Sequence, residues 1–310
     1  MSGTIIECVP NFSEGKDAAR VEAIVAAMQV DGVRLLDWSR DAGRNRSMVT
    51  IAGEPAAVVE AAVRGAGKAA ELIDLTRQEG EHPRIGAADV IPFVPLKGIK
   101  LEQCALLARQ AGLEIWRRFG VPIYFYEAAA SRPDRVNLED VRRGQFEGLK
   151  EAVDKEPSRR PDLGGPRLHP TAGASAVGAR KFLIEYNIYF DSSDVAVARA
   201  IAREVRAASG GLKGVKAIGV LVHGRAQLAM NITDFEATPV SEVHRKVASL
   251  AARHKTAIAK GELIGLIPEA ACEREGDWMR QLDGFDEETK ILERRLEHPL
   301  AWPEKRSRQE

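Results

Sequence analysis

The segment Glu79–Asp89 combines groups that can transfer protons with residues that fix the backbone. It places His82 and Arg84 among three carboxylates and two glycines. Histidine titrates near neutral pH and can both accept and donate a proton. Pro83 restricts the backbone of His82, and Gly86 permits a sharp turn. The pattern indicates a positioned general acid/base at His82, and it fits equally a loop histidine that only hydrogen-bonds the backbone.

A second segment, Asp37–Arg46, has residue types that suit the binding of carboxylates. Arg44, Asn45 and Arg46 lie near the ends of two expected strands, and a guanidinium group pairs bidentately with a carboxylate. A third segment, Gly164–Ala174, has small residues that let a flat ligand approach the backbone closely. For these two segments a solvated loop and a stiff interdomain linker remain equally good interpretations.

Several classes of function are disfavoured by the sequence. Lysine plus arginine equal aspartate plus glutamate at 45 each, whereas a general nucleic-acid binder would show a basic excess. The sequence contains no GxxxxGK[ST] loop, no GxGxxG after a strand and no GxSxG elbow. The three cysteines are far apart, so we expect reduced thiols and no metal site. The N-terminus lacks a signal peptide and no apolar stretch could span a bilayer, so we expect a cytoplasmic protein without membrane contact.

Hydrophobic periodicity predicts the elements that position these segments. The order strand, helix, strand, strand, helix, strand occurs twice, and it is the order of ferredoxin-like folds. In the first half the expected elements are Ile5–Val9, Asp17–Met28, Val33–Trp38, Ser47–Ile51, Glu54–Asp74 and Ala88–Leu96, followed by a helix at Leu101–Phe119 and a strand at Ile123–Glu127. In the second they are Lys181–Phe190, Asp194–Ala208, Val215–Val222, Leu228–Ile232, Val240–His254 and Leu263–Pro268. Between the halves, Ser131–Pro166 has the composition of a partly helical, exposed connector. The sequence therefore predicts an α+β protein of two subdomains with a cleft between them.

Four separated strings resemble the glutamate formimidoyltransferase family in the same order along the chain. They are Glu7–Gly15, Gly80–Ala87, Gly178–Ile184 and Asn231–Phe235. The resemblance implies two tandem ferredoxin-like (βαββαβ) subdomains at 1–165 and 166–275, with a charged tail at 276–310. It implies transfer of a formimino group from N-formimino-L-glutamate to N5 of tetrahydrofolate, a step of histidine degradation that needs no metal.

The resemblance also implies roles for individual residues. His82 matches the family's catalytic histidine. The family's folate-binding stretch falls on Gly164, Gly165, Pro166, Arg167, His169, Thr171 and Gly173. Our own hypothesis for the mechanism adds further residues. The carboxylate that orients His82 would be Asp37, Asp41 or Asp89, and these three stay open. Because both substrates carry glutamate carboxylates, the cations that bind them would be Arg44, Arg46, Arg84 and Arg167, with Asn45 beside them.

The chain resembles the stand-alone bacterial form of the family, so we expect the cyclodeaminase of the next step to be a separate protein. Two alternatives share the fold but not the reaction: a folate-dependent formyltransferase that uses formylglutamate or 5-formyltetrahydrofolate, and a folate-binding protein without catalysis. A structural or interaction module would leave the two charged loops unexplained. Exposed sheet edges favour a homodimer.

Overall fold

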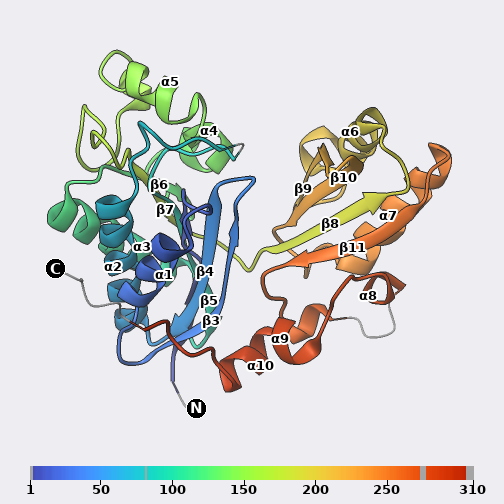
Figure 1. Cartoon of the computed structure of the whole chain (residues 1–310), viewed down its shortest axis with the longest axis horizontal. Helices are drawn as coiled ribbons and strands as arrows, with labels where there is room; N and C mark the ends of the chain where they lie inside the picture. The colour runs from blue at the N-terminus through green and yellow to red at the C-terminus, as the bar shows by residue number, and fades with distance from the viewer. Residues whose placement is uncertain (1–2, 81, 273–276, 305–310) are drawn as a thin grey trace. The chain divides into compact units, whose positions relative to one another are not determined.

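The computed structural model describes residues 3–80, 82–272 and 277–304, and the chain divides into two compact units. Unit 1 comprises Met1–Arg180 with Pro299–Glu310, and unit 2 comprises Lys181–His298. Each unit is mixed α+β and contains one sheet, of seven strands in unit 1 and four in unit 2 (Figure 1). None of the helices described is both long and apolar enough to cross a membrane.

The sheet of unit 1 is mostly antiparallel. Strand β1 lies between β4 and β5, and β3 pairs with the outer side of β4. The short β2 continues the path of β1 between the same two neighbours. Beyond β5, strands β7 and β6 are added in parallel. The strands are β1 (Ile5–Cys8), β2 (Asn11–Phe12), β3 (Val33–Asp41), β4 (Arg46–Gly53), β5 (Ala88–Lys97), β6 (Ile123–Glu127) and β7 (Ser175–Ala179).

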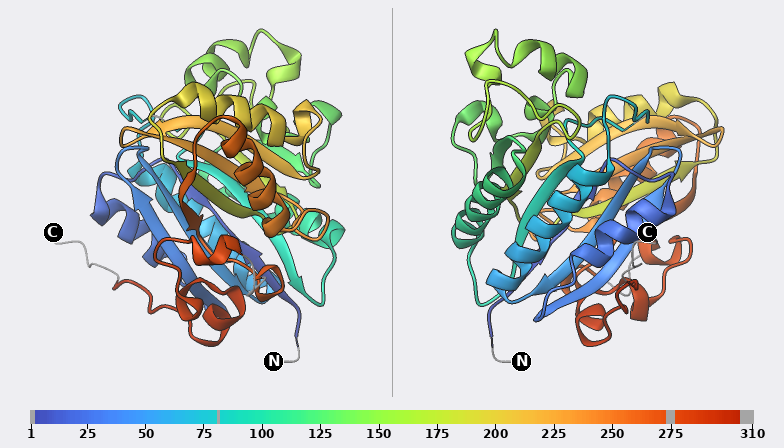
Figure 2. Two further views of the ribbon diagram at one scale, coloured as in Figure 1. Left: turned by 90° about the vertical axis from the view of Figure 1, so that its right-hand side faces the viewer. Right: turned by 60° about the vertical axis from the view of Figure 1, so that its left-hand side comes forward.

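Three helices cover one face of this sheet, as Figures 1 and 2 show. They are α1 (Ala18–Ala27), α2 (Pro55–Leu72) and α3 (Leu101–Phe119). Small residues let α2 approach α3 closely, since a Cβ on Gly67 would lie 2.2 Å from the ring of Phe119. Successive residues of a strand point to opposite faces. Ile6 and Cys8 therefore enter this core, whereas Glu7 lies on the opposite face, as does Asn11 beside the core residue Phe12.

The segment after β6 is packed rather than extended. It forms two helices, α4 (Leu138–Val141) and α5 (Gln145–Ala152), and Phe146 is buried. The buried Arg135 pairs with Asp162 in the same segment. The partly helical, largely exposed character expected of this segment is confirmed, and its few buried residues and its ion pairs attach it to unit 1.

Unit 2 has the strand order β11-β8-β10-β9, all antiparallel. The strands are β8 (Ile184–Phe190), β9 (Val215–Val222), β10 (Arg225–Ile232) and β11 (Ile258–Ile264), and the helices are α6 (Val195–Val205) and α7 (Val240–Arg253). A tight turn joins β9 to β10, with positive φ angles of 48° at His223 and 76° at Gly224. The last strand begins earlier than Leu263, the start that the sequence indicated.

The C-terminal region is part of both units. Three short helices follow β11, namely α8 (Asp277–Arg280), α9 (Glu287–Lys290) and α10 (Leu292–Glu297). Trp278 and Ile291 are fully buried in unit 2, and Ile291 lies between α9 and α10. Leu300 pairs with Leu35 in unit 1. The described part of the expected charged tail, 277–304, therefore packs on the rest of the chain, and 305–310 lie outside the described residues.

The boundary between the units falls at Arg180, later than the 165/166 boundary expected from the sequence. The reason is β7, which follows the expected boundary in the sequence and pairs with β5 and β6 of the first sheet. The observed architecture is α+β with two sheets in two units, and the helix and strand positions in the first 127 residues agree with the sequence prediction to within a few residues.

Glu7 gives a first prediction, because burial raises its pKa to about 7 while the nearby Arg180 opposes this rise. Between the ordinary carboxyl pKa and pH 7, the folded protein keeps a proton that the unfolded chain has lost. Stability therefore decreases as the pH rises through this window. We expect Glu7→Gln to remove this decrease. The gain in the free energy of unfolding of the variant over the wild type should be larger at pH 8 than at pH 4, by on the order of 2 kcal/mol. The measurement is Tm against pH, with the exposed Glu151→Gln as control. Parallel Tm curves for Glu7→Gln and the wild type would contradict the prediction.

Candidate active site

His82 lies in the loop between α2 and β5, and close backbone contacts on both sides shape this loop. A Cβ on Gly80 would lie 2.6 Å from the carbonyl oxygen of Arg44, and one on Gly86 only 1.9 Å from that of Ala174. Both positions therefore require glycine for lack of space, which is a different reason from the sharp turn that the sequence indicated at Gly86. Glu81, which precedes His82, lies outside the described residues.

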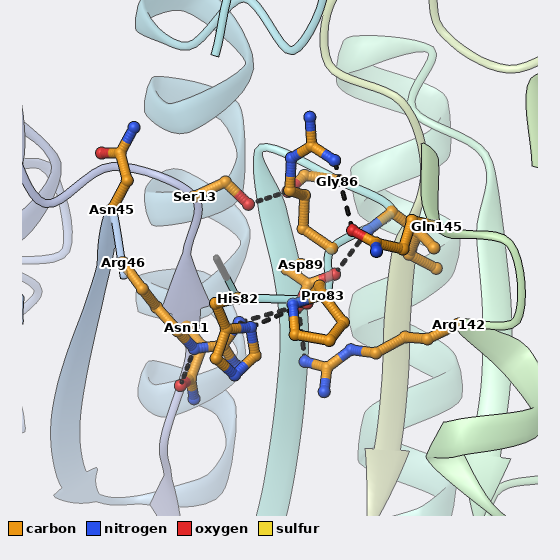
Figure 3. Close-up of polar contacts among 12 residues, drawn as sticks. Asn11, Ser13, Asn45, Arg46, His82, Pro83, Gly86, Asp89, Arg142 and Gln145 are labelled. Atoms are coloured by element: carbon orange, nitrogen blue, oxygen red, sulfur yellow. Dashed lines mark hydrogen bonds and ion pairs between the residues drawn. The ribbon is translucent and has the colours of Figure 1, made fainter. Parts of the chain in front are cut away.

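The imidazole of His82 is held through one nitrogen. Nδ1 lies 2.7 Å from the carbonyl oxygen of Pro83 and 2.9 Å from Nη1 of Arg46 (Figure 3). A carbonyl only accepts and a guanidinium only donates, so Nδ1 makes one of these hydrogen bonds in each neutral tautomer. When Nδ1–H donates to Pro83, the lone pair is on Nε2. His82 then presents a base at Nε2.

Asp89 is the carboxylate that connects this histidine to the rest of the site. Its side chain is fully buried, and its Oδ2 accepts hydrogen bonds from Arg46, at 2.9 Å, and from Arg142. Its Oδ1 accepts from the backbone N–H of Ile85 at 2.8 Å. In Figure 3 the two arginines reach Asp89 from opposite sides, and Arg46 lies against His82. Asp89 thus fixes the guanidinium group of Arg46, which in turn contacts His82.

Charge and burial decide the protonation states. Burial and the positive charges of Arg46 and Arg142 lower the pKa of His82 to about 3, although Asp89 opposes this effect. Burial also disfavours the charged form of Asp89, but the guanidinium groups of Arg142 and Arg46 outweigh it and lower the pKa of Asp89. At neutral pH the site therefore contains an ionised carboxylate, two cations and a neutral imidazole that is ready to accept a proton.

The other two aspartates named as orienting candidates lie differently. Asp41 is half exposed, and its carboxylate accepts from the backbone N–H of Arg44 at 2.9 Å and pairs with its guanidinium. Asp37 pairs with Thr50 in the ladder between β3 and β4. Of the three candidates, the structure joins Asp89 to His82 by hydrogen bonds through a shared arginine.

Arg84 and Asn45 hold the His82 loop in place through hydrogen bonds and an ion pair. Arg84 is buried and forms a bidentate pair with Glu147 of α5, while its Nε donates to Gln78 at 2.7 Å. Asn45 accepts from the backbone N–H of Gly15 and donates to the carbonyl oxygen of Glu79 at 2.8 Å. These contacts hold both sides of the segment that carries His82. Arg44, in contrast, is exposed beside Asp41.

The stretch Gly164–Gly173, which the resemblance implies for folate binding, contacts the His82 loop only near its C-terminal end. Ala87 donates its N–H to the carbonyl oxygen of Ala172, and Ala174 donates to Ile85, both at 2.9 Å. Gly173 lies in this contact with φ of 69°, and its Cβ would be 2.2 Å from the carbonyl oxygen of Ile85. The turn Thr171–Gly173 is thereby part of the site's framework.

The other residues of that stretch lie elsewhere on unit 1. Nδ1 of His169 accepts from the backbone N–H groups of Thr171 and Ala172, and burial lowers the pKa of this histidine. His169 also lines a pocket of about 570 Å³ with residues of α2 and α3. Gly164 packs on Trp116, Gly165–Pro166 is a cis peptide bond, and Arg167 is exposed.

Three residues that contribute to the site were not singled out from the sequence. Asn11 accepts from Nε of Arg46 at 3.0 Å, and Ser13 donates to the carbonyl oxygen of Gly86 at 2.7 Å. Both lie in the string Glu7–Gly15, so its resemblance to the family was the sequence feature that could have identified them. Arg142 lies in the charged connector, where no local pattern distinguishes it from its neighbours. Within the described ranges there is no group of three or more His, Cys, Asp or Glu residues that could hold a metal ion.

Comparison with known proteins gives matches over both units. The model of the formiminotransferase domain, N-terminal subdomain, matches residues 5–180, and that of the formiminotransferase domain matches residues 185–294. The chain is 42% identical over 295 residues to a glutamate formimidoyltransferase of Streptococcus pyogenes serotype M1, covering 94% of this chain and 98% of that protein. It is 43% identical over 299 residues to a glutamate formimidoyltransferase of Thermoplasma acidophilum, covering 95% of this chain and 98% of that protein. A formimidoyltransferase-cyclodeaminase of Gallus gallus is 41% identical over 275 residues, which are 86% of this chain and 51% of that protein.

Proposed function

The chain belongs to the formiminotransferase family, and we propose that it transfers the formimino group of N-formimino-L-glutamate to N5 of tetrahydrofolate, with His82 as the proton shuttle. The products are 5-formiminotetrahydrofolate and L-glutamate. The protein is a formimidoyltransferase of folate one-carbon metabolism and histidine degradation, since relatives with this activity match it over nearly their whole length. The observation that carries the role of His82 is the contact of its Nδ1 with the carbonyl oxygen of Pro83, which leaves the lone pair of the neutral imidazole on Nε2.

The reaction needs a group that first removes a proton and then returns it. N5 of tetrahydrofolate attacks the formimino carbon, and the adduct is tetrahedral. Nε2 of His82 takes the proton from N5, and the imidazolium then protonates the glutamate nitrogen as its bond to carbon breaks. The low pKa of His82 in the free protein supports the first step, because the imidazole is neutral before the substrates bind. Tetrahydrofolate is a co-substrate in this scheme, and no metal takes part.

We also infer that both units are ferredoxin-like. The support is strand order: β11-β8-β10-β9 in unit 2 and β5-β1-β4-β3 in unit 1, each with one helix after its first strand and another after its third. Unit 1 would then carry α3, β6 and β7 as an extension. We also propose that the stretch Gly164–Gly173 binds folate. At the C-terminal end of this stretch, the contact of Gly173 with the His82 loop supports this role.

Two expectations made from the sequence stay predictions. One is the cytoplasmic location. The other is association of two copies, which the edge strands β9 and β11 of the four-stranded sheet would permit.

The reaction is tested with purified protein, tetrahydrofolate and formiminoglutamate. Acid converts 5-formiminotetrahydrofolate to methenyltetrahydrofolate, which is measured by absorbance. We expect turnover with formiminoglutamate and much slower turnover with formylglutamate, which differs by an oxygen in place of NH. Turnover with the formyl donor alone would replace the reaction by formyl transfer. Folate binding without turnover of either donor would indicate a carrier, for which a positioned base has no use.

A further inference from the structure

Two guanidinium groups near His82 share one carboxylate. Arg46 and Arg142 both bind the same oxygen of Asp89. The side chain of Arg142 is only 15% exposed, and that of Asp89 is fully buried. Partly buried charges are stable when paired, and among the described residues Arg142 forms an ion pair with this shared oxygen, so its guanidinium group is a place for a further anion.

Arg142 has one hydrogen-bond donor that the protein itself does not satisfy. Its Nη2 is engaged by Asp89, whereas its Nε is buried and has no hydrogen-bond partner in the structure. A guanidinium group has five N–H donors and binds carboxylates through two of them at a time. The contact with Asp89 holds the guanidinium in place and leaves the group able to bind a second carboxylate.

Two of the arginines that the sequence suggested as substrate-binding residues already have partners within the protein. Arg84 already has a bidentate partner in Glu147, and a pair of this kind occupies one edge of a guanidinium. Arg44 pairs with Asp41 at an exposed position. Arg142 therefore combines three properties: it is close enough to His82 to affect its charge, it is fixed by a buried partner, and it keeps an unpartnered donor.

We propose that Arg142 binds the α-carboxylate of the formimino donor beside His82. This rests on the proposed function, because it assigns a role in binding its substrate. The choice of carboxylate follows from the chemistry of the donor. In formiminoglutamate the α-carboxylate is attached to the carbon that bears the reacting nitrogen, whereas the glutamate of folate is separated from N5 by a benzoyl group. A cation next to the proton shuttle therefore meets the donor's α-carboxylate.

The proposal has a consequence for the proton transfer. The positive charges of Arg46 and Arg142 disfavour the imidazolium form of His82, and a carboxylate bound to Arg142 offsets part of this effect. Donor binding then increases the proton affinity of His82 at the moment when it must accept a proton from N5. The groups that control this change are Arg46 of β4, Arg142 after α4 and Asp89 of β5.

The kinetic test compares Arg142→Gln with Arg143→Gln, whose side chain is 75% exposed and pairs with Asp140. We expect Arg142→Gln to raise KM for formiminoglutamate by about tenfold to a hundredfold, the usual worth of a hydrogen bond between charged groups. KM for tetrahydrofolate should change less than about twofold, and Arg142→Lys should recover part of the loss. A rise in KM for tetrahydrofolate instead would assign Arg142 to the folate tail. A fall in kcat with both KM values unchanged would leave it only a positioning role.

Equilibrium binding tests the proposal without turnover. The probes are N-acetyl-L-glutamate, its α-amide and its γ-amide, measured by calorimetry with the intact protein. The wild type should bind N-acetyl-L-glutamate about tenfold or more tightly than the α-amide, and Arg142→Gln should bind these two alike while still discriminating against the γ-amide. Equal preference for the α-carboxylate in both proteins would overturn the proposal. Absence of turnover with a preserved binding pattern would instead count against the proposed reaction.

Discussion

Replacement of His82 by alanine is expected to lower kcat by about a hundredfold or more, because general acid/base catalysis contributes about a hundredfold to ten-thousandfold. Both proton transfers of the reaction are assigned to this one side chain. The carbonyl oxygen of Pro83 holds the imidazole through Nδ1, which leaves Nε2 as the atom that exchanges the proton. The measurement is kcat with saturating formiminoglutamate and tetrahydrofolate. The exposed His298 provides the matched control, since His298→Ala removes an imidazole far from this loop in the sequence.

The pH dependence gives a second readout of the same residue. The profile of kcat/KM reports groups of the free enzyme. Because the pKa of His82 is lowered to about 3 in the free protein, kcat/KM should not fall as the pH decreases through the ordinary histidine range near 6.5. The decrease should come only at more acidic pH, where His82 becomes protonated. Activity of His82→Ala within a few-fold of the wild type would remove His82 from the mechanism.

Asp89→Asn is expected to have the largest combined effect on activity and stability. The substitution keeps the shape of the side chain but removes the only carboxylate that the structure shows paired with Arg46 and Arg142 within the described residues. Breaking a buried ion pair leaves uncompensated charge, and we expect a loss of about 3 kcal/mol in the free energy of unfolding. We also expect kcat to fall at least about tenfold, because Arg46 loses the anchor that holds it against His82. Urea unfolding and steady-state kinetics measure the two losses.

The acid side of the stability curve tests this assignment of Asp89. A carboxyl group whose pKa is lowered by folding stabilises the protein above its unfolded pKa, and this contribution is lost as the pH falls through the folded pKa. The wild type should therefore lose stability on acidification below about pH 4, and Asp89→Asn should lose less. Asp41→Asn, in the exposed pair with Arg44, is the control and should leave the curve unchanged. Equal acid slopes in Asp89→Asn and the wild type would refute the role of Asp89.

The local features of this protein were predictable from the sequence for physical reasons. Hydrophobic periods of two and of 3.6 residues mark strands and helices wherever one face is buried. The helix Leu101–Phe119 and the strand Ile123–Glu127 have the bounds that the periodicity indicated. The prediction was weaker in the charged segments 131–166 and 276–310, where buried residues such as Phe146 and Trp278 are few and pack against cores built by other parts of the chain.

For the candidate site, the sequence identified the chemical groups better than their roles. His82 and Asp89 lie within one string, so their proximity followed from the chain itself. Arg84 looked like a substrate cation, but its partner is Glu147, which is 63 residues away. Asn45 looked like a ligand-binding residue, but its amide braces the backbone at Gly15 and Glu79. An arginine or asparagine in a loop has the same local signature whether its partner is a substrate or another part of the chain.

The sequence by itself determined the order of helices and strands, the loop that carries His82 and the resemblance that named its chemistry. Only the tertiary structure decided which charges meet in that loop. Arg142 is 53 residues from Asp89, and β7 enters the first sheet from beyond the charged connector. The physical reason is that secondary structure depends on neighbours along the chain, whereas protonation and ion pairing depend on neighbours in space. The protonation state of His82 is set by its burial and by the charges of Arg46 and Arg142, and all of these follow from the fold alone.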